Sequence, residues 1–134
     1  MERAVAGKMD NQQDEVCVER KKDVKLVNLT HRTVVILSHD YTELLRLNPS
    51  GTVASCEICP TITDYINGIP VGGYTYKAVR GVPSPKNGVV YVVTYAVLQA
   101  LGGSRQDVVS PDTSQDSVVR DGKGVVRGVL RFRR

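Results

Sequence analysis

The chain has 134 residues, the length of one domain, and its hydrophobic content of 41% is ordinary for a folded protein with a modest core. No window approaches the roughly 20 apolar residues of a membrane helix, and the first residues lack the apolar stretch of a secretory signal, so we expect a cytoplasmic protein without a membrane span. The net charge of +4 sits largely at residues 20–22 and 131–134, which flank the predicted core. Aromatic residues make up only 5% of the chain, so surfaces for base stacking are scarce, although nucleic-acid binding stays open as an alternative.

The domain is predicted to begin at residue 23. Residues 1–22 are polar and charged without a sustained period, which predicts a flexible polar arm. From residue 23 to residue 134 no composition shift marks an internal boundary, so we expect a single domain. Segments of strand composition follow one another in its first part, at residues 24–30, 33–38, 43–48 and 52–58.

A hairpin is predicted within residues 61–70, because Asn67-Gly68 lies between apolar β-formers. Residues 71–79 continue as a strand interrupted by Gly72-Gly73, which predicts a bulge or a close approach of another backbone. A proline-rich connection at residues 81–88 then leads to the next strand.

The stretch around which we expect the chain to be organised begins at residue 88. Residues 89–93 form a continuous run of β-formers, typical of a strand that is covered on both faces. Residues 94–101 then change to helical spacing, with Thr94 as a candidate N-cap and Gly102-Gly103 as a helix end. The pattern predicts a buried strand that leads into one short helix.

The polar segment at residues 103–113 is predicted to be a loop, and it has two interpretations. Loops held by rigid elements often carry function, and Arg105 has the planar group that suits a phosphate or a carboxylate. The simpler interpretation is an internal pair of Arg105 with Asp107 or Asp112, and a plain turn at residues 110–112.

Residues 117–120 and 124–132, on either side of Asp121-Gly122-Lys123, predict a terminal hairpin. Its Arg120 is a candidate to face the loop at residues 103–113. The exposed edges of such a hairpin, with Val125-Val126 and Val129-Leu130, would suit a symmetric homo-oligomer. In total the chain predicts a β-rich α+β domain with antiparallel or mixed strands and one short helix.

Cys56 and Cys59 form a C-x-x-C motif, but a second half of a zinc site is missing. Cys17, His31 and His39 stand apart from one another in the sequence, and the two histidines are most simply turn residues on hairpins. We therefore predict no metal and no cofactor. Phosphate-loop, dinucleotide-binding and G-x-S-x-G patterns are absent from the sequence, which favours a non-enzymatic protein.

From about residue 27 to residue 130 the chain resembles a family of small uncharacterised proteins encoded by phages and bacterial chromosomes, whose members open on an Asn-Leu-Thr-Pro-His type motif. Here that motif stands as Asn28-Leu29-Thr30-His31-Arg32, so the family's Pro-His pair is replaced by His31-Arg32. The further matching pieces are residues 49–54, 68–71, 81–83, 90–93, 105–112 and 119–122. The resemblance implies an accessory protein of a phage or another mobile element.

The sequence thus favours a binding module for a small anionic, nucleotide-like ligand. Two alternatives stay open: a structural or interaction protein that assembles through strand edges, and a nucleic-acid-binding protein. The predicted ligand-binding residues are Ser104, Arg105, Asp107, Asp112, Thr113 and Arg120.

Overall fold

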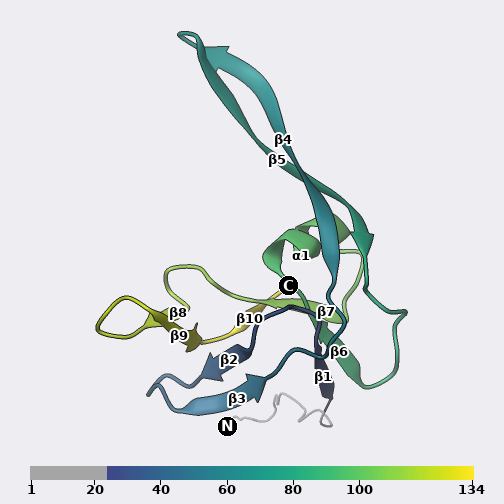
Figure 1. Ribbon diagram of the computed structural model, residues 1–134, viewed down its shortest axis with the longest axis vertical. Coiled ribbons are helices and arrows are strands. Elements are labelled where there is room, and N and C mark those ends of the chain that lie inside the picture. Colours follow the sequence, from purple (N-terminus) through teal and green to yellow (C-terminus); the bar gives the residue numbers. More distant parts are fainter. Residues whose placement is uncertain (1–23) are drawn as a thin grey trace, which may run out of the picture.

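The computed structural model describes residues 24–134, so the predicted arm at residues 1–22 and Cys17 lie outside the described part. Ten strands and one helix form there, and the β-rich α+β class is confirmed. The strands of the two larger sheets are β1 (Lys25–Asn28), β2 (Val34–Leu37), β3 (Glu43–Leu47), β6 (Val89–Val92), β7 (Val108–Pro111), β8 (Val118–Arg120), β9 (Val126–Val129) and β10 (Phe132–Arg133). A long hairpin of β4 (Ser55–Ile66) and β5 (Ile69–Arg80) and the helix α1 (Tyr95–Leu101) complete the fold (Figure 1). No helix in residues 24–134 is long and apolar enough to cross a membrane.

The first sheet has the strand order β1-β6-β7-β10, in which β1, β6 and β7 are parallel and β10 is antiparallel to β7. The central position of β6 is the one predicted for the continuous apolar run at residues 89–93. Helix α1 connects β6 to β7, as parallel neighbours require a crossover rather than a tight turn. Thr94 caps the helix with its side chain, and Gly102 ends it in the left-handed conformation, both as predicted.

The second sheet has the order β3-β2-β9-β8, with β2 and β9 parallel and the other pairs antiparallel. The first sheet lies between this sheet and α1. Alternation along β6 and β7 explains why both faces are apolar: Tyr91, Val93 and Val108 pack with Val97 of α1. The intervening residues of the same strands turn to the second sheet, where Val92 and Val109 pack with Val34, Ile36 and Val129.

The long hairpin projects from this body (Figure 1), and its strands pair only with each other within the described chain. The Asn67-Gly68 turn has positive φ at both residues, as the predicted hairpin required. Gly72 lies beside a β-bulge, where an added Cβ would come within 1.9 Å of the Thr61 carbonyl oxygen. The predicted close approach of a backbone at the glycine pair is therefore present. A second bulge, with Ala78 at a φ of 58°, lies at the base, where the hairpin packs on α1.

Two predicted elements were wrong in detail. The loop predicted at residues 103–113 contains β7, because Val108 and Val109 are buried on the two faces of the first sheet. Residues 110 and 111 are consequently the end of a strand, and Asp112 directly follows it, so this segment is not a free turn. The strand predicted at residues 124–132 ends at Val129, and Phe132–Arg133 crosses to the first sheet as β10.

His31 also differs from the prediction of a turn residue on a hairpin. The strands on either side of it, β1 and β2, belong to different sheets, so His31 lies in a connection between the sheets. His39 does lie in the turn of the β2–β3 hairpin, as predicted.

Candidate ligand-binding site

The connection between the two sheets is held by a buried asparagine. Asn28, at the end of β1, donates from Nδ2 to the carbonyl oxygens of Arg32 at 2.8 Å and Leu47 at 3.0 Å. Its Oδ1 accepts hydrogen bonds from the backbone nitrogen of Thr30 at 2.9 Å and from the Thr30 hydroxyl at 2.7 Å. Asn28 is only 2% exposed, so each of these polar groups needs its partner. The side chain thereby fixes the backbone of residues 28–32 at the end of the parallel strands.

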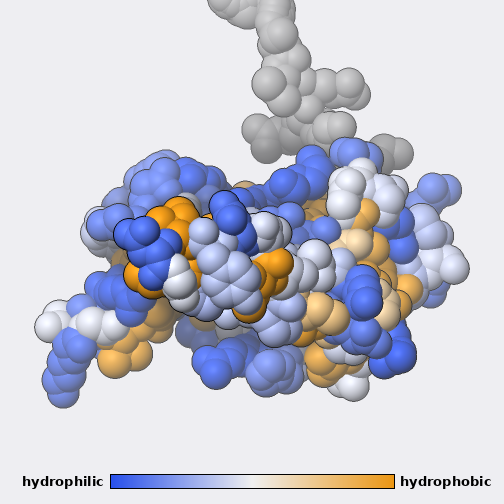
Figure 2. Space-filling view, turned by 90° about the horizontal axis from the view of Figure 1, so that it is seen from above, coloured by the Kyte–Doolittle hydropathy of each residue, from blue (hydrophilic) through white to orange (hydrophobic). Residues whose placement is uncertain are grey.

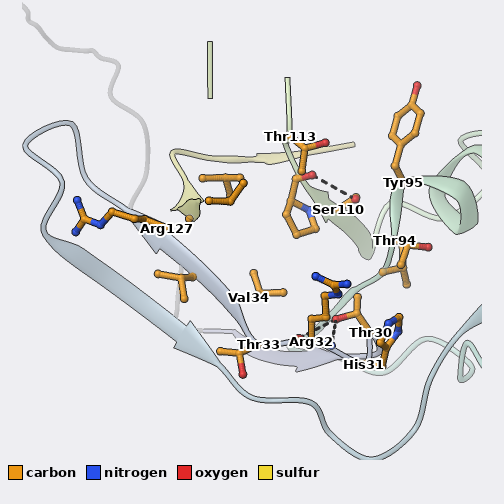
Figure 3. Close-up of a pocket in the computed structure, with 16 residues that line it drawn as sticks. Thr30, His31, Arg32, Thr33, Val34, Thr94, Tyr95, Ser110, Thr113 and Arg127 are labelled. Atoms are coloured by element: carbon orange, nitrogen blue, oxygen red, sulfur yellow. Dashed lines mark hydrogen bonds between the residues drawn. The ribbon is translucent and has the colours of Figure 1, made fainter. Parts of the chain in front are cut away.

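A pocket of about 500 Å³ opens at this place. Thr30, Thr94 and Ser110 lie where β1, β6 and β7 end, so the pocket is at the carboxyl edge of the three parallel strands (Figure 3). Ligands of open sheets with parallel strands bind at this edge, because the connections there diverge and leave a crevice. The second sheet closes the opposite side with apolar side chains of β2 and β9. A mostly apolar pocket with a few polar groups is typical of a small-molecule site, and so is its size.

The charged side chains that line the pocket are two arginines, Arg32 and Arg127. The lining also includes His31, and it includes no Asp or Glu among the residues that the structure describes. Within residues 24–134, neither arginine side chain forms an ion pair. The guanidinium of Arg32 is directed toward the middle of the pocket, and that of Arg127 points away from it at the far side (Figure 3). The pocket therefore offers unneutralised positive charge beside hydroxyl groups, which suits an anion.

Asp112 directly follows the end of β7, which lines the pocket. Its carboxylate, however, accepts hydrogen bonds from groups outside the pocket. Oδ2 accepts a hydrogen bond of 2.6 Å from Arg131, and Oδ1 accepts one of 3.0 Å from the Ser114 backbone nitrogen. The hydrogen bonds from Ser114, followed by Arg131, lower the pKa of Asp112 from its ordinary 3.8 to about 2. Asp112 is buried and ionised, and it holds the chain end against β7. This arrangement keeps its negative charge out of the pocket lining.

Arg105 and Asp107, both predicted as ligand-binding residues, bind each other. Nε and Nη2 of Arg105 each donate a 2.8 Å hydrogen bond to one carboxylate oxygen of Asp107, and Nη2 also donates to the Pro83 carbonyl oxygen at 2.9 Å. The hydrogen bonds from Arg105 lower the pKa of the Asp107 carboxyl. The simpler of the two interpretations, an internal pair with Asp107, is the one that the geometry matches. Arg105 also borders a smaller depression of about 190 Å³ on the outer side of α1.

The structure does not bring the six predicted residues together. Thr113 lines the pocket at the carboxyl edge of the parallel strands, whereas Ser104 lies exposed in the turn after α1. Arg120 donates to the Gly124 carbonyl oxygen within the β8–β9 hairpin and borders a third depression together with Asp121. The sequence reasoning missed Arg32, Arg127 and the hydroxyls of Thr30, Thr94 and Ser110.

Cys56 and Cys59 are both free thiols. Burial raises the pKa of the Cys56 thiol, whose side chain packs toward α1 at the base of the hairpin. In residues 24–134 no three His, Cys, Asp or Glu side chains gather in a way that would hold a metal ion. The described residues therefore assign no chemistry to the C-x-x-C motif.

Comparison of the chain with protein-family models, with curated proteins and with solved structures gives no match. The fold and the pocket define a β-rich α+β domain with a basic crevice at the end of its parallel strands.

Proposed function

We propose that the protein binds a small anionic ligand of the nucleotide type in the pocket at the carboxyl edge of β1, β6 and β7. The observation that carries the proposal is the charge of this pocket: the guanidinium of Arg32 points into it and has no acidic partner among the described residues, and the lining has no carboxylates. A guanidinium forms strong charge-assisted hydrogen bonds with a carboxylate or a phosphate. In this pocket a ligand would supply the acidic group that Arg32 lacks.

The pocket offers complementary groups to each part of such a ligand. Arg32 supplies the charged donor for a phosphate, and Thr94 and Thr113 are hydroxyl-bearing lining residues on two other segments. The apolar side chains of Val34, Val93 and other lining residues suit the flat, less polar face of a base. The resemblance of residues 27–130 to small phage and bacterial proteins supports an accessory role in a mobile element.

Isothermal titration calorimetry with a panel of mononucleotides, dinucleotides and inorganic phosphate tests the proposal. We expect one class of nucleotide to bind with one site per chain. Because a hydrogen bond to a charged group contributes about 1.5–3 kcal/mol, Arg32→Ala should weaken binding by about ten- to a hundredfold.

Arg120→Ala is the matched control, since it removes an exposed arginine that lies outside the pocket. This variant should bind as the wild type does. Equal weakening by both substitutions would indicate a general charge effect, and the absence of binding across the whole panel would refute the proposal. Binding of single-stranded oligonucleotides in preference to mononucleotides would support the nucleic-acid alternative instead.

A further inference from the structure

The long hairpin of β4 and β5 has no covering layer in the described chain. Both strands have twelve residues, and only their base packs on the body, through Cys56 and Val79 beside α1. An isolated two-stranded hairpin is marginally stable in water, because neither of its faces is buried. A hairpin of this length is therefore expected to gain stability from a partner surface.

One face of this hairpin is apolar. In the register of the pair, Ile58 lies opposite Tyr76, Pro60 opposite Tyr74, and Tyr65 opposite Pro70. Cross-strand partners share a face, and alternate residues of the regular strand β5 do so too. The apolar face of the hairpin thus consists chiefly of Ile58, Pro60, Ile62, Tyr65, Tyr74 and Tyr76. Seen from above, the described part of the molecule has orange hydrophobic side chains at its surface among hydrophilic ones (Figure 2).

The opposite face differs in that it bears the polar and charged side chains of Thr61, Asp64 and Thr75, although near the turn it also bears Ile66, Ile69 and Val71. Asp64 is the one charged residue between Cys59 and Tyr76, and it lies off the apolar face. A surface without Lys or Arg does not suit nucleic acid, whose binding rests on phosphate contacts. A surface without charge likewise offers nothing to a charged peptide, but it does not repel an identical surface.

The exposed area is sufficient for a symmetric contact. Ile58, Ile62, Tyr65 and Tyr74 are 53%, 59%, 61% and 64% exposed. With about 200 Å² for a tyrosine and somewhat less for an isoleucine, these fractions amount to about 450 Å². Tyr76 and the two prolines add roughly 100–150 Å², so two such faces would bury about 1,100–1,200 Å² together, near the lower limit for specific interfaces.

We propose that the apolar face of the β4–β5 hairpin binds the same face of a second copy of this chain, in a two-fold symmetric dimer. In a two-fold interface the same patch of each subunit contacts that patch of the other subunit. An uncharged face with aliphatic and aromatic side chains can therefore pack against a copy of itself. Packing of two sheets face to face also gives each hairpin the second layer that it lacks. This interface lies away from the basic pocket and is independent of the ligand proposed above.

Sedimentation velocity of the full chain over a concentration series tests the dimer. We expect a species of twice the 14.7 kDa chain mass, with a dissociation constant of micromolar order for an interface of about this size. Ile62→Glu places a charge in the centre of the face and should raise the dissociation constant at least tenfold. Val71→Glu is the matched control, because it replaces another exposed β-branched residue on the opposite face.

A second pair, Tyr74→Lys against Thr75→Lys, repeats the comparison with the opposite charge on neighbouring residues of β5. Circular dichroism should show the same strand content in all four variants, since the substituted side chains are exposed. A wild-type chain that stays monomeric up to several hundred micromolar, well above the constant expected for such an area, would overturn the proposal. Equal effects of the paired variants on a dimer would also overturn it, because the contact would then lie elsewhere.

Discussion

Replacement of Arg105 by alanine separates a structural role from a ligand-binding role. The wild-type side chain makes three hydrogen bonds, two to Asp107 and one to the Pro83 carbonyl oxygen. Hydrogen bonds to charged groups contribute about 1.5–3 kcal/mol when buried, but the two side chains are 20% and 21% exposed, so water recovers part of the loss. We expect a loss of about 2 kcal/mol in the free energy of unfolding, or about 8 °C in Tm for a domain of this size.

Chemical denaturation in urea of the wild type, Arg105→Ala, Asp107→Ala and the double variant gives the coupling energy of the pair. We expect a coupling energy of about 1–2 kcal/mol, because the two side chains hydrogen-bond to each other and are mostly shielded from solvent. Arg46→Ala is the control, since Arg46 makes an equally close pair with Glu43 but both side chains are well exposed. Exposed pairs contribute little, so that variant should keep the wild-type unfolding midpoint.

If the pocket binds a nucleotide as proposed, the same variants should bind it with wild-type affinity. Loss of ligand binding in Arg105→Ala without loss of stability would refute this reasoning, and it would restore the loop after α1 as the binding site. A coupling energy near zero would refute the structural part by itself.

Two further predictions concern the strand ends. Asn28→Ala removes four hydrogen bonds, two to the carbonyl oxygens of Arg32 and Leu47 and two from the backbone nitrogen and the hydroxyl of Thr30. At about 1 kcal/mol each, their loss should lower the free energy of unfolding by about 3–4 kcal/mol, measured by urea denaturation. If Asn28→Ala unfolds with the same free energy as the wild type, the hydrogen bonds of Asn28 do not hold the connection between the sheets. Because the folded pKa of Asp112 is about 2, below its ordinary value of 3.8, its contribution to stability is full above about pH 4 and is lost as the pH falls toward 2. Asp112→Asn should therefore have a lower Tm at neutral pH and a shallower fall of Tm between pH 5 and pH 2, and an unchanged slope would contradict the assignment.

The elements that the sequence predicted correctly are those decided by neighbours along the chain. The helix at residues 95–101 needed Thr94 before it and Gly102 after it, and the turn of the long hairpin needed Asn67-Gly68. These are local effects, since a cap bonds to a backbone group of the next turn and a glycine relieves strain at its own φ. The buried place of β6 was also predictable, because only a strand covered on both faces is apolar without alternation.

The errors arose where a distant segment decided the outcome. The polar composition around Val108-Val109 favoured a loop, but the crossover through α1 returns these two valines beside β6, where both faces are covered. Likewise, no residue near Phe132 indicates that the chain leaves the second sheet after β9 and that Phe132 pairs with Pro111 of β7.

For the candidate site, the sequence by itself determined the residue types: arginines, hydroxyls and a buried-strand pattern that leads to polar ends. Only the tertiary structure decided which of the arginines are available, because Asp107 takes Arg105, Asp112 takes Arg131, and Arg32 has no such partner in the described chain. Asp107 is two residues from Arg105, so the sequence already suggested that pair, whereas Arg131 reaches Asp112 because β10 pairs with β7. Charge pairing acts over a few ångströms, and for segments far apart in sequence the strand pairing sets those distances.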